Sequence, residues 1–138
     1  MLIVDTNVLI DVFENDPDWS DWSVGRLREH SVVSALVINP IIYAELSMAF
    51  SKIEKLDAEI AALRLQVQEI PRPALFLAAK AFAKYRKLGG TKTNVLADFF
   101  IGAHAAVIEA PVLTRDPARY RNYFPTIRLI TPESERRP

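Results

Sequence analysis

Four acidic residues in this chain stand where acids on a protein surface are not usually found. Asp5 and Asp116 each come just after a short apolar run. Glu45 and Asp98 have mainly apolar residues three and four positions away, so on a helix each would lie within an apolar stripe. No Lys or Arg lies within four positions of Asp5, Glu45 or Asp98. Because a buried carboxylate without a partner is costly, these acids need a cation from elsewhere.

A hard divalent cation is the partner that such a set of carboxylates favours. Mg²⁺ and Mn²⁺ take carboxylate and water ligands, activate water and offset charge on a phosphate group. Zinc is a poor choice, because the chain has no cysteine and only two histidines, His30 and His104. His104 comes six residues after Asp98 and would face another side of a helix, so we interpret both histidines as structural or solvated.

Each acid also has a structural interpretation. Asp5 and Asp116 are explained about equally well as helix N-caps, since an aspartate often stands where a strand leads into a helix. Glu45 and Asp98 could instead form buried salt bridges with an arginine distant in sequence. Arg115 adjoins Asp116, but adjacent side chains of an extended segment point to opposite faces.

The elements that would position these acids alternate along the chain. Short apolar runs predict strands at residues 2–4, 32–38, 111–114 and 127–130. Apolar periodicity and capping residues predict helices at residues 16–30, 40–50, 53–68, 73–88 and 95–109, with Thr93 or Asn94 as the cap of the last. This order predicts a mostly parallel sheet with helices on both faces, where ligands bind beyond the carboxyl ends of the strands. Asp5 and Asp116 would then share one rim.

Composition fits a soluble globular chain. It has 138 residues, half of them hydrophobic, and its 17 basic residues balance 17 acidic ones. Without cysteine, disulfides and thiolate nucleophiles are excluded. The opening residues lack the pattern of a secretory signal, and no apolar run approaches the roughly 20 residues of a membrane helix, so we expect a cytoplasmic protein.

The four acids lie in short motifs that resemble those of PIN-domain ribonucleases, in particular the VapC-type toxins of bacterial toxin–antitoxin pairs. The motifs are Leu2-Ile3-Val4-Asp5-Thr6-Asn7, Ile38-Asn39 with Glu45 six residues later, Ala97-Asp98-Phe99-Phe100-Ile101-Gly102, and Leu113-Thr114-Arg115-Asp116 with the tail 117–125. The match runs in order through essentially the whole chain and keeps every acidic position. Residues 51–93 carry no motif.

This resemblance implies an α/β fold, a three-layer α/β/α sandwich with a mostly parallel sheet, formed by residues 1–138 as a single PIN-like domain. It also implies a metal-dependent endoribonuclease that acts as a toxin and is inhibited by a cognate VapB-type antitoxin. Such proteins are commonly dimeric, so we expect a homodimer or a toxin–antitoxin hetero-oligomer.

Carried over by position, the resemblance makes Asp5, Glu45, Asp98 and Asp116 the catalytic and metal-binding residues for Mg²⁺ or Mn²⁺. The three aspartates would be direct or water-mediated ligands. Glu45 would bind through water or help to deprotonate the attacking water. Thr6, Asn7 and Thr114 are candidate supporting residues that hydrogen-bond to the carboxylates, although capping explains them about as well.

Charge is distributed unevenly despite the zero total. Residues 1–30 hold seven acids and two basic residues, whereas residues 70–97 hold six basic residues and no acid: Arg72, Lys80, Lys84, Arg86, Lys87 and Lys92. The tail adds Arg119, Arg121 and Arg128, with Tyr120 and Tyr123 between them. RNA contacts need only a local basic surface, and tyrosines can stack on bases. A solvated helix face and core tyrosines are the plainer interpretations.

Two other features have two interpretations each. The apolar residues of the helix expected from residue 53 belong to the core or form one wall of a groove for an antitoxin helix: Ile53, Leu56, Ile60 and Leu63. Trp19 and Trp22 share a helical face and belong to the core or to an interface.

Two other functions compete with the ribonuclease. An aspartate-nucleophile phosphatase would use Asp5, but it normally needs a second aspartate two residues later, where this chain has Asn7. A PIN-like module that binds RNA or a partner without cleavage is the other alternative, and the four intact acids weigh against it.

Overall fold

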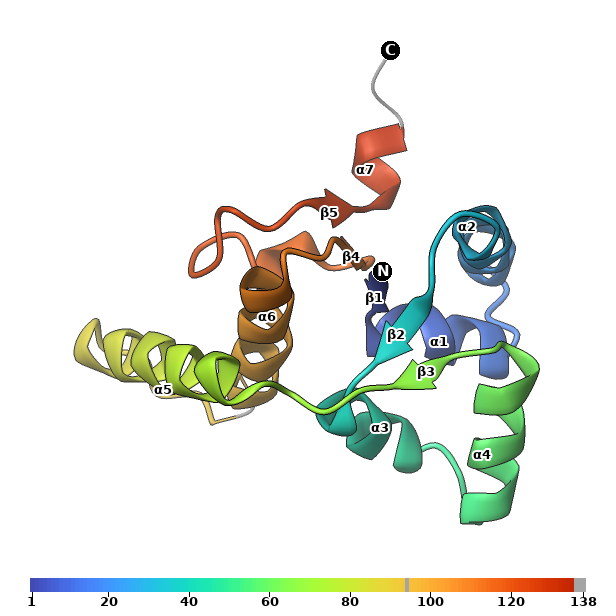
Figure 1. Ribbon diagram of the computed structural model, residues 1–138, viewed down its shortest axis with the longest axis horizontal. Helices are drawn as coiled ribbons and strands as arrows, with labels where there is room; N and C mark the ends of the chain where they lie inside the picture. The colour runs from blue at the N-terminus through green and yellow to red at the C-terminus, as the bar shows by residue number, and fades with distance from the viewer. Residues whose placement is uncertain (94, 136–138) are drawn as a thin grey trace.

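A five-stranded parallel sheet forms the centre of the computed structural model, which describes residues 1–93 and 95–135. The strand order is β3-β2-β1-β4-β5 (Figure 1). The strands are β1 (Leu2–Val4), β2 (Leu36–Ile38), β3 (Gln66–Val67), β4 (Val112–Leu113) and β5 (Leu129–Ile130). All four strand pairs are parallel, and Val4 of β1 lies beside Leu113 of β4. The chain builds outward from β1 to β3 and then returns to the other side of β1.

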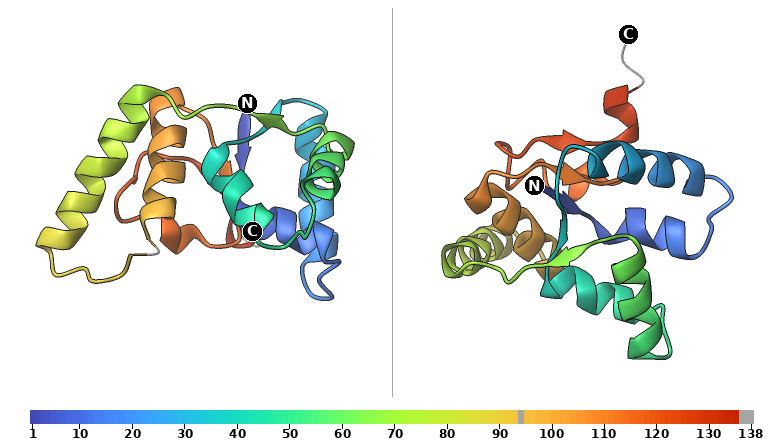
Figure 2. Two further views of the ribbon diagram at one scale, coloured as in Figure 1. Left: turned by 90° about the horizontal axis from the view of Figure 1, so that it is seen from below. Right: turned by 45° about the vertical axis from the view of Figure 1, so that its right-hand side comes forward.

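Both faces of the sheet are covered. All three residues of β1 are at most 1% exposed, and those of β2 and β4 are also buried. Because successive strand residues point to opposite faces, burial of consecutive residues requires a layer on each side. Figure 2 shows the helices flanking the sheet. The predicted α/β sandwich with a parallel sheet is therefore confirmed.

The flanking helices differ in detail from those expected. They are α1 (Thr6–Phe13), α2 (Ser20–Ser31), α3 (Pro40–Ser47), α4 (Ile53–Ala62), α5 (Arg72–Lys87), α6 (Leu96–Ile108) and the short α7 (Pro132–Glu135), with the 3-10 helix η1 at Pro117–Arg119. Helix α1 follows β1 directly and was not predicted. Asn94, one of the two expected caps of α6, lies outside the described residues.

The largest error of prediction concerns residues 53–68, which do not form one helix. Helix α4 ends at Ala62, Arg64 adopts a positive φ of 56°, and the chain then forms the edge strand β3. The apolar spacing on which this prediction rested continued past the turn to Val67, which instead belongs to β3 and is 51% exposed. Likewise the predicted strand at 32–38 begins only at Leu36, since Val32 and Val33 are exposed.

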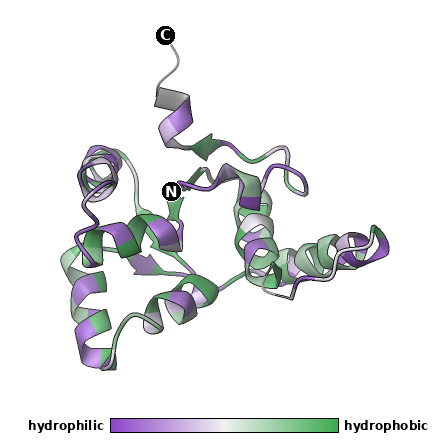
Figure 3. Cartoon of the chain, turned by 180° about the vertical axis from the view of Figure 1, so that it is seen from behind, coloured by the Kyte–Doolittle hydropathy of each residue, from purple (hydrophilic) through white to green (hydrophobic). Residues whose placement is uncertain are grey.

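Helices α5 and α6 pack on each other around a second apolar cluster. Ala74, Ala78 and Ala81 of α5 face Phe99 and Ala103 of α6. Small side chains at this spacing let the two helices approach closely. The outer face and the basic C-terminal end of α5 remain in solvent. Figure 3 colours that end as hydrophilic because its last turn is rich in basic residues. No helix among residues 1–93 and 95–135 is long and apolar enough to cross a membrane.

Candidate functional site

The candidate site lies where the sheet reverses its strand order, beyond the carboxyl ends of β1 and β4. Asp5 follows β1, and Thr114 and Asp116 follow β4. The register that pairs Val4 with Leu113 brings Asp5 next to Thr114. Such a reversal point leaves a crevice between neighbouring loops, which is where ligands bind to open parallel sheets.

Asp5 is fully buried and is held by donors from several elements. Its Oδ1 accepts hydrogen bonds from the Thr6 backbone N–H at 2.7 Å and from Arg119 Nη1 at 2.7 Å. Its Oδ2 accepts from the Thr114 hydroxyl and the Tyr120 hydroxyl, each at 2.8 Å. Asn7 Nδ2 adds a longer contact of 3.4 Å to Oδ2. Asp5 is thus the N-cap of α1 and also part of the acidic site, so the two interpretations of this residue are compatible.

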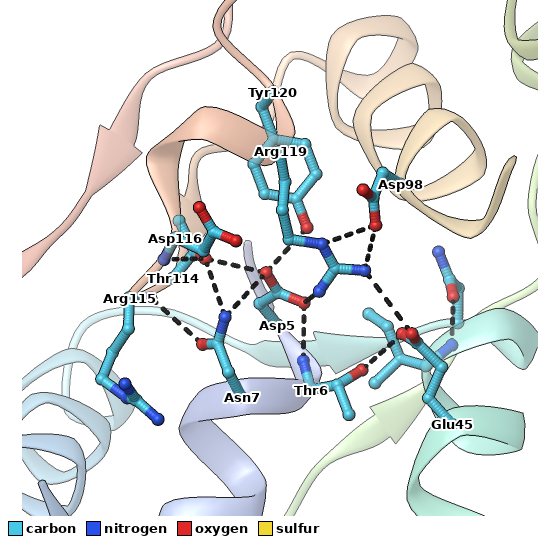
Figure 4. Close-up of polar contacts among 12 residues, drawn as sticks. Asp5, Thr6, Asn7, Glu45, Asp98, Thr114, Arg115, Asp116, Arg119 and Tyr120 are labelled. Atoms are coloured by element: carbon cyan, nitrogen blue, oxygen red, sulfur yellow. Dashed lines mark hydrogen bonds and ion pairs between the residues drawn. The ribbon is translucent and has the colours of Figure 1, made fainter. Parts of the chain in front are cut away.

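One guanidinium joins three of the four acids. Arg119 donates from Nη1 to Asp5, from Nε to Asp98 Oδ1 at 2.6 Å, and from Nη2 toward Glu45 Oε2 at 3.5 Å (Figure 4). Its Nη2 also forms an ion pair with Asp98. We call Arg119, Asp5, Glu45 and Asp98 the Arg119 cluster. The distant arginine considered from the sequence as a salt-bridge partner is therefore present.

The charges in the Arg119 cluster do not balance, since three carboxylates share one guanidinium. Burial raises the pKa of the Asp98 carboxyl; Arg119 opposes that shift, and the nearby Asp5 and Glu45 carboxylates add to it. Burial alone would lower the pKa of the Arg119 guanidinium, but Asp5 and Asp98 raise it above its ordinary value. Arg119 is thus firmly charged, yet it does not relieve Asp98 completely.

Glu45 is positioned by a chain of polar contacts below it. Asn39 accepts a hydrogen bond at its Oδ1 from the Ile42 N–H at 2.9 Å and so caps α3, the helix that carries Glu45. Asn39 Nδ2 lies 3.2 Å from His104 Nδ1. Burial lowers the pKa of His104, which is consistent with a neutral ring that accepts from Asn39. His104 is therefore structural, as predicted.

The apolar stripe expected around Glu45 is only partly present. Ile42 is buried, but α3 ends at Ser47 and Met48 is 83% exposed. Glu45 is half-buried, between the buried and the exposed face of this helix. The Thr6 hydroxyl holds it by donating to its Oε1 at 2.7 Å. This half-buried position exposes part of the Glu45 carboxylate to the pocket described next.

Asp116 completes the acid set in a different way. It is exposed and stands before η1, and its side chain makes no capping hydrogen bond, so the N-cap interpretation is wrong for this residue. Its backbone N–H donates to the Thr114 hydroxyl at 3.0 Å. An open pocket of about 520 Å³ is lined by the following residues: Thr6, Asn7, Ile10, Glu45, Asp98, Arg115, Asp116 and Arg119. The four predicted acids therefore lie in or directly beneath one pocket.

The donor set fits a hard cation in its chemistry: carboxylate and hydroxyl oxygens, with no sulfur and no imidazole facing the pocket. Among the described residues, however, no group of three or more His, Asp or Glu side chains is arranged closely enough to hold a metal ion. The Arg119 guanidinium lies between the carboxylates that would have to converge.

A second arginine near the pocket is arranged quite differently. Arg115 donates from Nε and Nη2 to the two oxygens of the buried Asp11, at 2.6 and 2.8 Å. The Ser23 hydroxyl also donates to Asp11, at 2.8 Å, and the guanidinium carbon lies 4.9 Å from the centre of the Trp19 ring. We call the ion pair of Arg115 and Asp11, which Ser23 and Trp19 support, the Arg115 pair. Figure 4 shows the Arg115 side chain turned away from Asp5.

Sequence reasoning missed Asp11 and the contacts that Tyr120 and Arg119 make with the acids. Asp11 was not recognised, although its place in α1, six residues after Asp5, was a usable signal once that helix was expected. Tyr120 was considered for base stacking; it is fully buried and donates to Asp5, so its core interpretation holds. The contact of Arg119 with the acids crosses more than 100 positions to Asp5 and left no local signal.

Comparison with known proteins places these features in a wider setting. A family model described as "PIN domain" matches residues 2–124. Among curated protein sequences, none matches this one significantly. The solved structures that the fold resembles include VapBC2 from Rickettsia felis bound to a DNA fragment from their promoter, with a TM-score of 0.72 and 18% identity over 94% of this chain and 97% of that one.

Two further structures show the same likeness. VapBC from Salmonella typhimurium, bound to DNA, has a TM-score of 0.67 and 22% identity, with 94% of this chain and 96% of that chain covered. FitAcB from Neisseria gonorrhoeae has a TM-score of 0.66 and 20% identity, with 96% and 99% covered. At these identities the structures establish the fold.

Proposed function

The chain belongs to the PIN-domain family, and we propose that it is a metal-dependent endoribonuclease that acts as the toxin of a toxin–antitoxin pair. The proposed reaction is hydrolysis of a phosphodiester bond in RNA. The residues proposed to perform it are Asp5, Glu45, Asp98 and Asp116.

One observation carries this proposal: four carboxylates from four separate segments lie around one open pocket at the point where the sheet reverses its strand order. A structural ion-pair network needs only enough acid to match its arginines. Here Asp5, Glu45 and Asp98 share Arg119, and Asp116 faces the same pocket. This excess of negative charge in a partly buried pocket favours a second cation.

The second cation is proposed to be Mg²⁺ or Mn²⁺, held by Asp5, Asp98 and Asp116 directly or through water. When bound, such an ion activates water and offsets charge on the phosphate. Glu45 would help to hold the ion through water or would accept a proton from the attacking water. Thr6 orients Glu45, and Thr114 and Tyr120 orient Asp5, through the hydrogen bonds that they donate.

RNA is proposed to reach the pocket over basic surface. Lys80, Lys84, Arg86 and Lys87 are all exposed on α5, whose basic end leads through residues 88–93 toward α6 and Asp98. A basic surface that leads toward an acidic pocket would hold the phosphate backbone of RNA near the bond that is cut.

The proposed partner is a VapB-type antitoxin, and the proposed assembly is a homodimer or a toxin–antitoxin hetero-oligomer in the cytoplasm. Met48 is 83% and Ile53 60% exposed, and Ile53 borders a pocket of about 140 Å³ between α3 and α4. Leu56 and Ile60 of the same helix are buried core residues. The likeness to the solved structures of VapBC2 and FitAcB is the reason to look for a partner, and the exposed apolar side chains are the reason to look on this surface.

The phosphatase alternative is weakened by Asn7. Its side chain donates to Asp5 and Thr114 and accepts from the Arg115 N–H, so it serves as a structural connector and offers no acid or base. The other alternative, a PIN-like module that binds RNA or a partner without cleavage, differs from the proposal only in lacking catalysis. The same experiment therefore tests both.

That experiment is cleavage of labelled single-stranded RNA by the purified full chain in Mg²⁺ or Mn²⁺, with mapping of the new 5′ ends. Glu45→Gln should remove cleavage while RNA binding remains. Glu54→Gln, an exposed glutamate on the neighbouring α4, is the matched control and should cut normally. Tight RNA binding without cleavage by the wild type would favour the binding module. Growth arrest on expression, relieved by the adjacent small gene product, tests the toxin role.

A further inference from the structure

Arg119 lies at the centre of the acidic pocket and pairs with most of its carboxylates. It contacts three of the four acids, and its side chain is only 13% exposed while still lining the pocket. It is carried by η1, a single turn of 3-10 helix, and not by one of the long helices. Its guanidinium therefore enters the cluster from a short segment at the pocket rim.

The hydrogen-bonding capacity of Asp5 is already used in this arrangement. A carboxylate offers about four acceptor sites, and Asp5 accepts short bonds from Thr6, Thr114, Tyr120 and Arg119. A metal ion that binds Asp5 must therefore replace one of these donors.

Only one of those four donors is free to leave. The Thr6 N–H is fixed by α1, and Thr114 and Tyr120 are both fully buried beside β4 and η1. Thr6 also lines the open pocket, but it donates to Asp5 from its backbone, whereas Arg119 donates from a side chain, so its guanidinium can exchange the carboxylates for water. It also makes the second contact that a metal would need, to Asp98.

From these contacts we propose that Arg119 is a resident counter-ion of the acidic pocket, which a divalent cation must displace from Asp5 and Asp98 before it can bind. The inference rests on the proposed metal-dependent function. Without metal, Arg119 keeps three mutually repelling carboxylates together. When metal is added, the divalent ion and the Arg119 guanidinium compete for the same carboxylate oxygens. The free energy needed to remove Arg119 from them therefore weakens the apparent metal affinity.

Calorimetric titration of the full chain with MnCl₂ tests this competition. Arg119→Gln should bind Mn²⁺ about tenfold more tightly than the wild type, because no guanidinium has to be removed first. The same variant should unfold at a lower temperature in metal-free buffer, since the acids then repel each other without a counter-ion. A merely structural arginine would lower the unfolding temperature without raising the metal affinity.

Arg121→Gln is the matched control, because it removes the same charge two positions away. Arg121 is exposed and pairs with Glu133 at 3.4 Å, outside the cluster. Its Mn²⁺ affinity should equal that of the wild type. An equal gain in both variants would mean a general effect of net charge and would overturn the proposal.

A measurement on the wild type covers the case in which Arg119→Gln does not fold. In ¹⁵N spectra, the signal of the Arg119 Nε–H, which donates to Asp98 and is assigned from its absence in Arg119→Lys, should shift or disappear as Mg²⁺ is added. An unchanged signal at saturating Mg²⁺ would overturn the proposal.

The outcomes also separate this inference from the proposed function. If the wild type binds Mn²⁺ and Arg119→Gln binds it equally or more weakly, only the role of Arg119 is wrong. If neither binds Mn²⁺ or Mg²⁺, the metal-dependent function fails and the displacement fails with it.

Discussion

Arg115 and Arg119 stand four residues apart, and each contacts a buried aspartate from the first eleven residues of the chain. In the Arg115 pair, both oxygens of Asp11 receive bonds from a single guanidinium, and Trp19 covers the arginine. In the Arg119 cluster, one guanidinium is divided among Asp5, Glu45 and Asp98. The number of acids per arginine is the difference that matters.

That difference distinguishes a structural ion pair from the proposed functional site. A carboxylate matched by one bidentate arginine is neutralised and satisfied, and its environment has no use for another cation. Acids in excess of their arginine keep a net negative charge at the pocket, which only a further cation or a proton can remove. We therefore expect substitutions in the Arg119 cluster to affect activity, and substitutions in the Arg115 pair to affect stability.

Asp98→Asn is the substitution expected to have the largest effect. Removing an outer partner of a metal ligand commonly costs 10- to 100-fold in affinity or activity, so losing a proposed ligand should reduce RNA cleavage by at least about a hundredfold. The fold should persist, because a neutral amide at this position would relieve the crowding of buried negative charge. The rate of cleavage in Mg²⁺, together with thermal unfolding, measures both effects. Cleavage by Asp98→Asn at the wild-type rate would show that the Arg119 cluster is no more important for activity than the Arg115 pair.

Asp11→Ala tests the other side of the comparison. It leaves Arg115 without its acid and Ser23 without an acceptor, and breaking a largely buried ion pair should lower the free energy of unfolding by about 3 kcal/mol. Urea denaturation measures this loss. Mn²⁺ affinity of the folded protein should stay close to that of the wild type. A loss of metal binding in a folded Asp11→Ala protein would show that the two regions are not independent.

Thr114→Val has a smaller expected effect and tests how finely Asp5 is oriented. The buried hydroxyl donates to Asp5 and accepts from the Asp116 N–H, so it ties two of the proposed ligands together. Its loss should weaken Mn²⁺ binding about tenfold. Thr114→Ser keeps the hydroxyl and should retain wild-type affinity. Equal affinities in the Val and Ser variants would mean that Tyr120 and Thr6 orient Asp5 without help.

The sequence predicts the part of the site that depends on local pattern. Asp5 and Asp116 follow strands, and a parallel sheet necessarily brings such ends to one edge. Asn39 before Pro40 predicts the start of the helix that carries Glu45. For this reason the four acids, the parallel sheet and the structural role of His104 were all within reach of sequence reasoning.

Contacts across long stretches of chain were not within reach. Arg119 meets Asp5 across 114 positions and Asp98 across 21, and neither pairing leaves a periodic signal in the sequence. The boundary between α4 and β3 was lost for another reason: it depends on the left-handed backbone of Arg64, a conformation that glycine or asparagine would have marked more clearly. Local pattern thus located the acids but gave no information on what neutralises them.

A pH titration of stability gives the smallest expected effect. It distinguishes most directly between acids that outnumber their arginine, as in the Arg119 cluster, and an acid matched by one arginine, as in the Arg115 pair. Burial raises the pKa of Asp98 in the folded protein above the ordinary value of 3.8, so the folded state holds this proton more tightly than the unfolded state does. The resulting stabilisation is fully present below pH 3.8 and is lost as the pH rises through the raised pKa. In metal-free buffer, the difference in free energy of unfolding between the wild type and Asp98→Asn should therefore shift in favour of the wild type as the pH falls through this window. Its slope is limited to about 1.4 kcal/mol per pH unit, the value for one proton. A difference that is flat, or that slopes the other way, would mean that Arg119 neutralises Asp98 as completely as Arg115 neutralises Asp11, and the two regions would then not differ in kind.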